Sequence, residues 1–62
     1  NSDEAVELLI DMAADSEQTD FLVGLIQEMD PATLRKVVQR RRQTESNQQV
    51  VQILDRLEAV NM

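Results

Sequence analysis

Residues 21–38, FLVGLIQEMDPATLRKVV, decide the fold because they predict a helix, a tight turn and the start of a second helix. Five apolar residues recur at helical spacing in the first part and predict one apolar side: Phe21, Leu22, Leu25, Ile26 and Met29. Pro31 disfavours helical geometry at the residue before it, so we expect Asp30 to end the first helix and to cap the second. Pro31 itself suits the first helical position, where its missing N–H has no partner to lose.

The same signals predict four helices over the whole chain. The expected ranges are about 4–14, 17–29, 31–42 and 47–60, with Gln43-Thr44-Glu45 as a polar linker before the last helix. The predicted caps are Ser2 or Asp3 for the first helix, Asp15 or Ser16 (with Gln18 completing a capping box) for the second, and Ser46 with Gln49 for the fourth. Short helices joined by short loops predict one all-α domain, a compact bundle of four helices over residues 1–62. The start at Asn1-Ser2 suits a fragment of a larger protein.

Helical spacing also predicts the buried residues. On the first helix these are Ala5, Leu8, Leu9, Met12 and Ala13, with Val6 and Ile10 widening the same side. On the third and fourth helices they are Leu34, Val37, Val38, Val50, Ile53, Leu54 and Leu57. Val51 and Val60 lie off this stripe, and we expect them to be partly exposed.

The composition excludes most chemistry. The chain has no cysteine, no histidine and one glycine, so it lacks the nucleophile pairs, the ordinary zinc ligands and the phosphate-binding loops that enzymes use. We therefore expect no enzyme activity, no metal and no cofactor. The apolar runs are too short to span a membrane and no signal peptide is visible, so the cytoplasm is the default location.

Charge is divided unevenly along the chain. Residues 1–30 contain nine acidic residues and no base, whereas residues 31–62 contain six bases and three acids, which gives −9 and +3 and a sum of −6. We expect the two halves to attract each other in the folded state. Five of the bases, Arg35, Lys36, Arg40, Arg41 and Arg42, lie on the third helix. With a negative total and no aromatic residue for base stacking, they favour a solvated helix surface, or an acidic peptide guest, over direct binding of nucleic acid.

Gly24 lies near the middle of the second predicted helix, where glycine costs about 1 kcal/mol relative to alanine. Either the position is merely tolerated or allows a tight helix crossing, or a ligand or another backbone approaches closely there.

The octet Phe21-Leu22-Val23-Gly24-Leu25-Ile26-Gln27-Glu28, followed by a turn, a helix and a last amphipathic helix, resembles the MLLE domain. This small helical domain ends poly(A)-binding proteins and occurs in a HECT-type ubiquitin ligase and in fungal RNA-binding proteins of mRNA transport. Gly24 and Glu28 match the family octet KITGMLLE outright, whereas Leu22, Leu25 and Ile26 match in character.

The resemblance implies a monomeric module that binds a short linear peptide of another protein, with a peptide Phe beside Gly24 and a peptide Leu in a second pocket. The implied peptide-binding residues are Phe21, Gly24, Leu25, Ile26, Glu28, Val50 and Ile53. Four positions depart from the family pattern: Asp20 replaces a glycine, Phe21 a lysine, Ser46 a basic residue and Val50 an alanine. A bulky Val50 would narrow the aromatic pocket, and Phe21 could fill it from within.

Two other functions fit parts of the sequence. Met29-Asp30-Pro31 and Ile53-Leu54 resemble the turn and the terminal di-leucine of ubiquitin-binding CUE and UBA domains, although the central Phe is missing and the first helix would be surplus. A helical docking or oligomerisation domain would instead use an exposed seam formed by Met12, Val51, Val60 and Met62.

Overall fold

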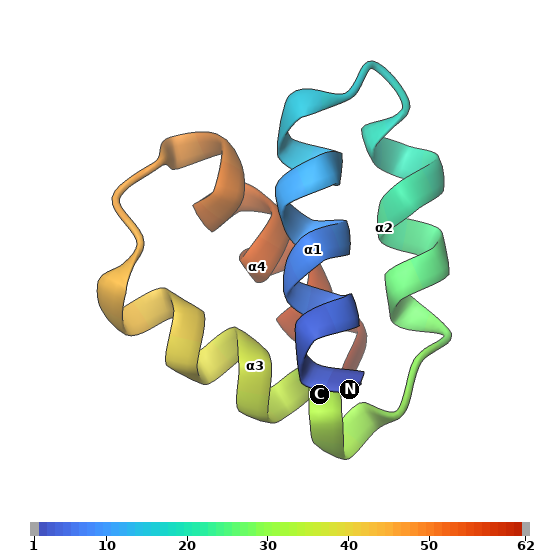
Figure 1. The fold of residues 1–62 in the computed structure, drawn as a ribbon, viewed down its shortest axis with the longest axis vertical. Helices are drawn as coiled ribbons and strands as arrows, with labels where there is room; N and C mark the ends of the chain where they lie inside the picture. Colours follow the sequence, from blue (N-terminus) through green and yellow to red (C-terminus); the bar gives the residue numbers. More distant parts are fainter. Residues whose placement is uncertain (1, 62) are drawn as a thin grey trace.

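The computed structural model describes the backbone of residues 2–61 and the side chains of residues 2–59. Within this part of the chain there are four helices and no strand: α1 (Ser2–Asp15), α2 (Thr19–Gln27), α3 (Pro31–Thr44) and α4 (Gln48–Asn61) (Figure 1). The predicted all-α class and the number of helices are confirmed. Four boundaries differ by two residues. α1 starts earlier, at Ser2, and α2 starts later, at Thr19. α2 also ends before Met29, and α3 continues through Gln43 and Thr44, which were expected in the linker.

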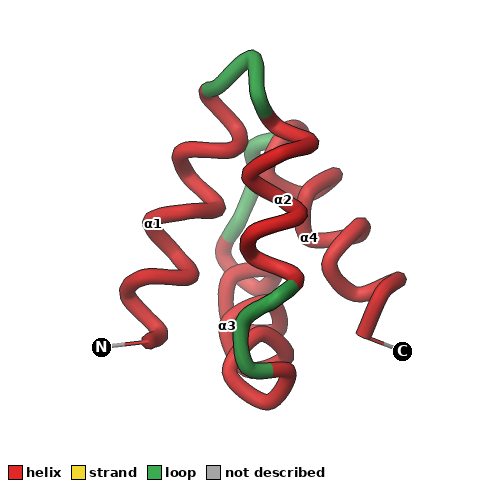
Figure 2. Tube along the Cα trace, turned by 90° about the vertical axis from the view of Figure 1, so that its right-hand side faces the viewer, coloured by secondary structure: helices red, strands yellow, loops and turns green. Residues whose placement is uncertain are grey.

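The helices form a bundle in which α1 and α2 lie side by side and antiparallel (Figure 1). α3 passes beneath this pair and α4 lies behind it. Seen from the side, α2 stands between α1 and α4, and the α1–α2 loop lies at the opposite end of the molecule from α3 (Figure 2). The radius of gyration is 10.2 Å, close to the roughly 10.6 Å expected for a folded domain of this length.

The turn at Asp30-Pro31 forms as its residues predict. The Asp30 carboxylate accepts hydrogen bonds from the backbone N–H and the hydroxyl of Thr33, both at 3.0 Å. Pro31 occupies the start of α3. At the end of α2, the N–H groups of Glu28 and Met29 donate to the carbonyls three residues earlier, which tightens the last turn.

The other predicted caps are wrong. Ser2 and Asp3 lie inside α1, and the residue before them is outside the described chain. α2 begins after Gln18 without a side-chain cap. There the Thr19 hydroxyl lies 2.8 Å from the carbonyls of both Ala13 and Ser16 and ties the end of α1 to the start of α2.

At α4 the cap is Asn47, one residue later than the predicted Ser46. Its side-chain oxygen accepts a hydrogen bond of 2.8 Å from the backbone N–H of Gln49. The helix starts at Gln48, so Asn47 is the residue whose side chain reaches the second free N–H, which is the geometry that a cap requires.

Twelve apolar side chains form the core between the four helices. They are Val6, Ile10, Ala13, Val23, Ile26, Leu34, Val37, Val38, Val50, Ile53, Leu54 and Leu57. The predicted burial on α3 and α4 is confirmed, and Val51 is half-buried as expected; the side chain of Val60 lies outside the described part.

The prediction for α1 is partly wrong, because Ala5, Leu8 and Met12 are exposed. The apolar arc of α1 is wider than the surface that the bundle can cover. The residues of α1 that face inward and are fully buried are Val6, Ile10 and Ala13. The apolar arc of α2 is also wider than its contact with the core. Phe21 and Leu25, predicted on the apolar side of this helix, are therefore exposed.

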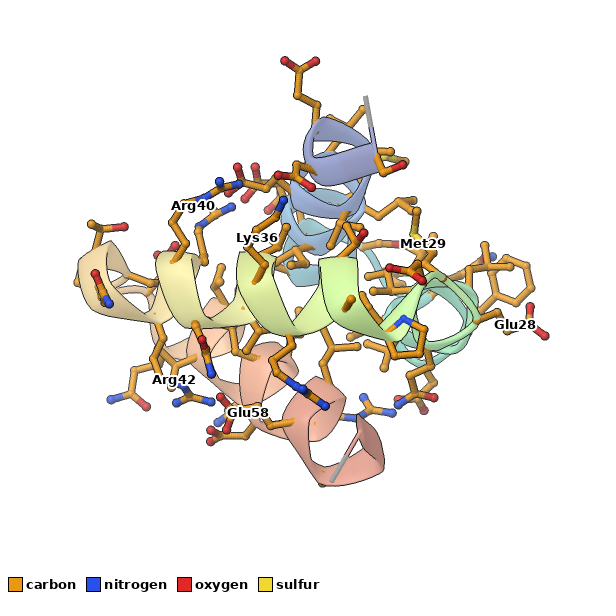
Figure 3. All side chains as sticks on the ribbon, turned by 90° about the horizontal axis from the view of Figure 1, so that it is seen from below. Glu28, Met29, Lys36, Arg40, Arg42 and Glu58 are labelled. Carbon is orange, nitrogen blue, oxygen red and sulfur yellow. The ribbon has the colours of Figure 1, made fainter. Side chains whose placement is uncertain are left out.

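Ion pairs join the acidic half of the chain to the basic half, as the charge distribution predicts. Lys36 pairs with Asp3 at 3.0 Å, and Arg40 pairs with Glu7 at 3.2 Å. Figure 3 shows Lys36 and Arg40 on the side of α3 that faces α1. These pairs are largely exposed, so each stabilises the fold by about 0–1 kcal/mol, and together they link α1 to α3.

Arg41 is more enclosed than its neighbours and holds several carboxylates. It pairs with Glu7 at 3.4 Å, with Glu45 at 2.7 Å, and with Asp11. The hydrogen bond to Glu45 and, after it, the contact with Asp11 raise the pKa of Arg41 above its already high ordinary value, so the guanidinium stays charged at any pH at which the protein folds.

Two further bases, Arg42 on α3 and Arg56 on α4, also form ion pairs. Arg42 pairs with Asp55 at 2.8 Å and Glu58 at 3.2 Å on the α4 side of α3 (Figure 3), and Arg56 pairs with Asp20 at 2.9 Å. Within the described chain, Arg35 is the one base without an ion pair. The basic residues of α3 are therefore neutralised mainly by the chain itself, which argues against the predicted acidic guest at this helix.

Candidate interaction surface

The residues predicted to bind a peptide fall into two groups that do not form one pocket. Ile26, Val50 and Ile53 lie in the core, with at most 4% of their surface exposed. Phe21, Leu25 and Glu28 lie on the outside of α2. Ile26 and Val50 are therefore part of the core in this structure, and their role as pocket walls stays a prediction.

Gly24 lies between these two groups on α2 and is half-exposed. A Cβ atom built at this position meets nothing within 4 Å in the described structure, and the backbone has no positive φ there. A tight helix crossing is thus excluded as the reason for this glycine. Two of the predicted explanations are compatible with this open space: a glycine that the helix merely tolerates, and a guest that approaches the backbone there.

The most distinctive surface of the molecule is a set of large apolar side chains exposed on α1 and α2. Their exposed fractions are 61% for Leu8, 48% for Met12, 62% for Phe21 and 41% for Leu25. We call these four residues the α1–α2 apolar face. Single exposed apolar residues are ordinary, but four in a domain this small form a feature that marks binding surfaces.

Helical geometry places the two exposed residues of each helix on one side of that helix, because Leu8 and Met12, and likewise Phe21 and Leu25, are four residues apart. On α1, the acids Asp3 and Glu7 pair with α3, whereas Leu8 and Met12 are exposed, and Met12 lines a hollow together with Leu22 of α2. On α2, Asp20 faces α4, and the opposite flank carries Leu25. Since α1 and α2 pack side by side, the two exposed pairs of apolar residues lie on neighbouring helices.

A shallow depression marks one end of this face, near the α1–α2 loop. It has a volume of about 410 Å³ and is lined by Met12 and Leu22 together with Asp11, Asp15 and Ser16. Met12 from α1 and Leu22 from α2 thus share one hollow. Beside this apolar floor lie two carboxylates, of which Asp11 is paired with Arg41 and Asp15 makes no ion pair with a described residue.

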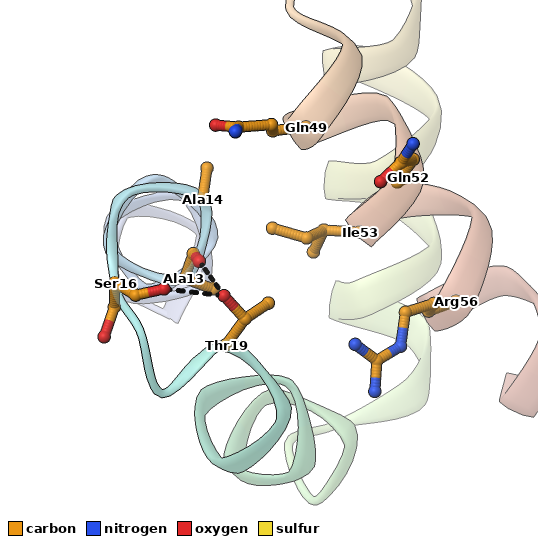
Figure 4. A pocket seen from close by; sticks show the side chains of 8 residues that line it. All are labelled: Ala13, Ala14, Ser16, Thr19, Gln49, Gln52, Ile53 and Arg56. Carbon is orange, nitrogen blue, oxygen red and sulfur yellow. Dashed lines mark hydrogen bonds between the residues drawn. The ribbon is translucent and has the colours of Figure 1, made fainter.

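A second, more enclosed hollow of about 260 Å³ lies between the α1–α2 corner and α4 (Figure 4). Its lining residues are Ala13, Ala14, Ser16, Thr19, Gln49, Gln52, Ile53 and Arg56. Ile53 is the single predicted site residue in this wall. The Thr19 hydroxyl is engaged by the carbonyls of Ala13 and Ser16, and Arg56 by Asp20. The hollow therefore offers mainly glutamine side chains and a small apolar floor.

The α1–α2 apolar face is bordered by carboxylates without ion pairs. Of the nine acids in residues 1–30, Asp3, Glu7, Asp11 and Asp20 are paired, and Asp30 caps α3. The other four are exposed and make no ion pair with described residues: Glu4, Asp15, Glu17 and Glu28. Figure 3 shows Glu28 projecting away from the bundle.

These carboxylates border the apolar side chains directly. Glu4 is one turn before Leu8, Asp15 is one turn after Met12, and Glu28 is one turn after Leu25. Neither α1 nor α2 contains a base. The surface is thus apolar at its centre and negative on both edges.

No family model, no curated protein and no solved structure matches this chain. Within the described residues, the four helices include none that is long and apolar enough to cross a membrane. The described part also holds no group of three or more His, Cys, Asp or Glu residues placed to bind a metal ion.

Sequence reasoning found half of the α1–α2 apolar face. It named Phe21 and Leu25 as binding residues but assigned Leu8 to the core. Met12 was assigned to the core as well, and was otherwise considered for an oligomer seam. The available signal was that the apolar arcs of both helices are wider than one core contact needs, so one edge of each had to remain outside.

Proposed function

We propose that this chain is a non-enzymatic interaction module that binds a short peptide segment of another protein on the α1–α2 apolar face. The observation that carries the proposal is the exposure of Leu8, Met12, Phe21 and Leu25 beside a complete core. Burying such side chains against a partner gains about 25 cal/mol for each Å² of apolar surface removed from water.

Two further observations support a binding role over a catalytic one. The chain has no histidine or cysteine, and within the described residues no charged or polar residue is buried. Shifted titratable groups in clefts are the usual sign of an active site. The resemblance to MLLE domains supports the same class of function, with Phe21 and Leu25 shared between the resemblance and the exposed face.

The ubiquitin-binding alternative draws little support from the structure. Ile53 and Leu54, which would form its di-leucine surface, are 2% and 0% exposed, and Met29 is half-buried. For the oligomerisation alternative, Met12 is exposed and Val51 is half-buried, whereas the side chains of Val60 and Met62 lie outside the described part.

The test is a selection from a phage-displayed library of random peptides, followed by titration of the isotopically labelled chain with the enriched peptides. We expect micromolar binding with amide shifts on α1 and α2 around Met12 and Phe21. In the double variant Phe21→Ser/Leu25→Ser, affinity should fall at least about tenfold, because two anchors of roughly 1 kcal/mol or more are removed.

Two controls make the outcome decisive. The first is Ala32→Ser/Ala59→Ser, which changes two exposed positions on α3 and α4 and should leave binding unchanged. The second is Gly24→Leu, which fills the open space beside α2. Binding that survives Phe21→Ser/Leu25→Ser but is lost in Gly24→Leu would overturn the assignment to the apolar face and move the site to Gly24. A library with no enriched peptide would overturn the proposed function itself.

A further inference from the structure

We infer that the partner on the α1–α2 apolar face is a basic amphipathic segment, one that presents apolar side chains flanked by lysine or arginine. This inference rests on the proposed function and names the chemistry of the ligand. It is carried by the placement of unpaired carboxylates along both edges of the face, where a bound segment must pass them.

The edges are negative, and no ion pair with a described residue neutralises them. Glu4 and Asp15 border the face on α1 and Glu28 borders it on α2, and none makes an ion pair with a described residue. By contrast, the acids of α1 that lie next to α3 form ion pairs. Asp3 pairs with Lys36 at 3.0 Å and Glu7 with Arg40 at 3.2 Å. The fold neutralises one flank of α1 and leaves the flank beside the apolar residues charged.

The same distribution argues against a second copy of this chain as the occupant. A symmetric dimer through this face would bring the carboxylate edges of both copies together, and like charges across an interface disfavour association. A contact with the basic helix of another copy is disfavoured too, because within the described residues Arg35 is the one base without an ion pair.

The depression near the α1–α2 loop shows how such a segment would be held. Met12 and Leu22 form its apolar part and Asp15 lies beside them. A lysine or arginine side chain can lay its methylene stem on the methionine while its charged end reaches the carboxylate. An acidic segment would instead meet the unpaired carboxylates Glu4, Asp15 and Glu28, and neither α1 nor α2 contains a base to attract it.

The experiment uses three synthetic helical peptides of about 16 residues, each titrated into the labelled chain. The first has leucine on one face and lysine on the other, the second has glutamate in place of every lysine, and the third has serine in place of every leucine. We expect the first to bind at least about tenfold more tightly than either of the others. Its affinity should fall several-fold when NaCl is raised from about 50 to about 500 mM, because exposed charge pairs are screened.

A matched pair of variants locates the charge effect. Glu4→Gln/Glu28→Gln removes two carboxylates from the edges of the face, and Asp55→Asn/Glu58→Gln removes two on α4, so both change the net charge by the same amount. The first variant should weaken the basic peptide about tenfold and the second by less than about twofold. Circular dichroism melting confirms that both remain folded.

The outcomes separate this inference from the function on which it rests. If the acidic and basic leucine peptides bind equally well at the α1–α2 apolar face, the interaction module stands and the basic partner is wrong. Equal binding of the serine peptide would mean that charge alone attracts the ligand, which also overturns the inference. If the two pairs of carboxylate variants weaken binding equally, the effect comes from net charge and not from this face.

Discussion

Gly24 is the residue at which α2 carries no side chain and has open space beside it. Its backbone is helical, so the glycine is not required by an unusual conformation. Glycine at this position lowers helix stability, and no close contact within the described residues requires it. The hypothesis that a guest binds at Gly24 is based on this absence of a structural reason.

Gly24→Ala should therefore stabilise the domain. The added methyl meets no atom within 4 Å, and alanine is favoured over glycine in a helix by about 0.5–1 kcal/mol. For a domain of this size, we expect the melting temperature to rise by about 2–8 °C, measured by circular dichroism. A fall in the melting temperature would show that the position is more crowded than the structure indicates.

Glu45 shows how one residue links two elements. It accepts a hydrogen bond from Arg41 at 2.7 Å and another from the backbone N–H of Asn47 at 3.1 Å, and so connects the end of α3 to the linker before α4. Both contacts favour the charged form. The hydrogen bond from Arg41 is the larger cause that holds the pKa of Glu45 below its ordinary value of 4.5.

This lowered pKa gives a stability contribution with a defined pH dependence. The contribution is fully present above the ordinary pKa of 4.5 and is lost as the pH falls through the lower folded-state value. Glu45→Gln should therefore reduce the melting temperature near pH 7, and the gap to the unmodified chain should shrink between about pH 5 and about pH 3. Glu17→Gln, at an exposed site without an ion pair, is the control. A gap that stays constant down to low pH would contradict the role assigned to Glu45.

At the scale of the element, each helix of this bundle starts in its own way. α3 has the Asp30 carboxylate and Pro31. α2 has no side-chain cap, and Thr19 fixes its start through the carbonyls of Ala13 and Ser16. α4 has Asn47. Because isolated helices of this length are marginal in water, such contacts and the packing of the core decide where each helix begins.

The cap of α4 can be tested by neighbouring substitutions. Asn47→Ala removes the acceptor of the 2.8 Å hydrogen bond from Gln49 and should destabilise the domain by about 1 kcal/mol. Ser46→Ala, at the position that the sequence pattern favoured, should change stability by less than about 0.5 kcal/mol. Urea unfolding followed by circular dichroism measures both. The reverse order of effects would restore Ser46 as the cap.

Sequence reasoning was most accurate where a residue leaves few alternatives. Pro31 restricts its neighbours so strongly that the end of α2 and the start of α3 were predicted to within about two residues. Caps were harder, because Ser46 and Asn47 are both good caps and only the position of the first helical turn chooses between them. The rotation of α1 was harder still, since Leu8 and Val6 are equally apolar and only the packing against α3 decides which is buried.

At the scale of the whole molecule, the 62 residues divide into a core that holds the fold and a face that the fold does not need. The core is apolar throughout within the described part, with no buried polar or charged residue. Ion pairs around it join the acidic α1 to the basic α3. The α1–α2 apolar face belongs neither to the core nor to the ion pairs. The binding residues implied by the family resemblance include both core residues and residues of this face.

This division predicts opposite results for core and face substitutions of similar size. Leu34 is fully buried, so Leu34→Ala should destabilise the domain by about 2–5 kcal/mol, which is a large part of the stability that a domain this small can have. Leu8→Ala removes the same atoms from a side chain that is 61% exposed, and should change the free energy of unfolding by less than about 0.5 kcal/mol. Urea unfolding of the two variants side by side is the measurement. A Leu8→Ala cost approaching that of Leu34→Ala would mean that Leu8 belongs to the core of the folded domain and is not free to bind a partner.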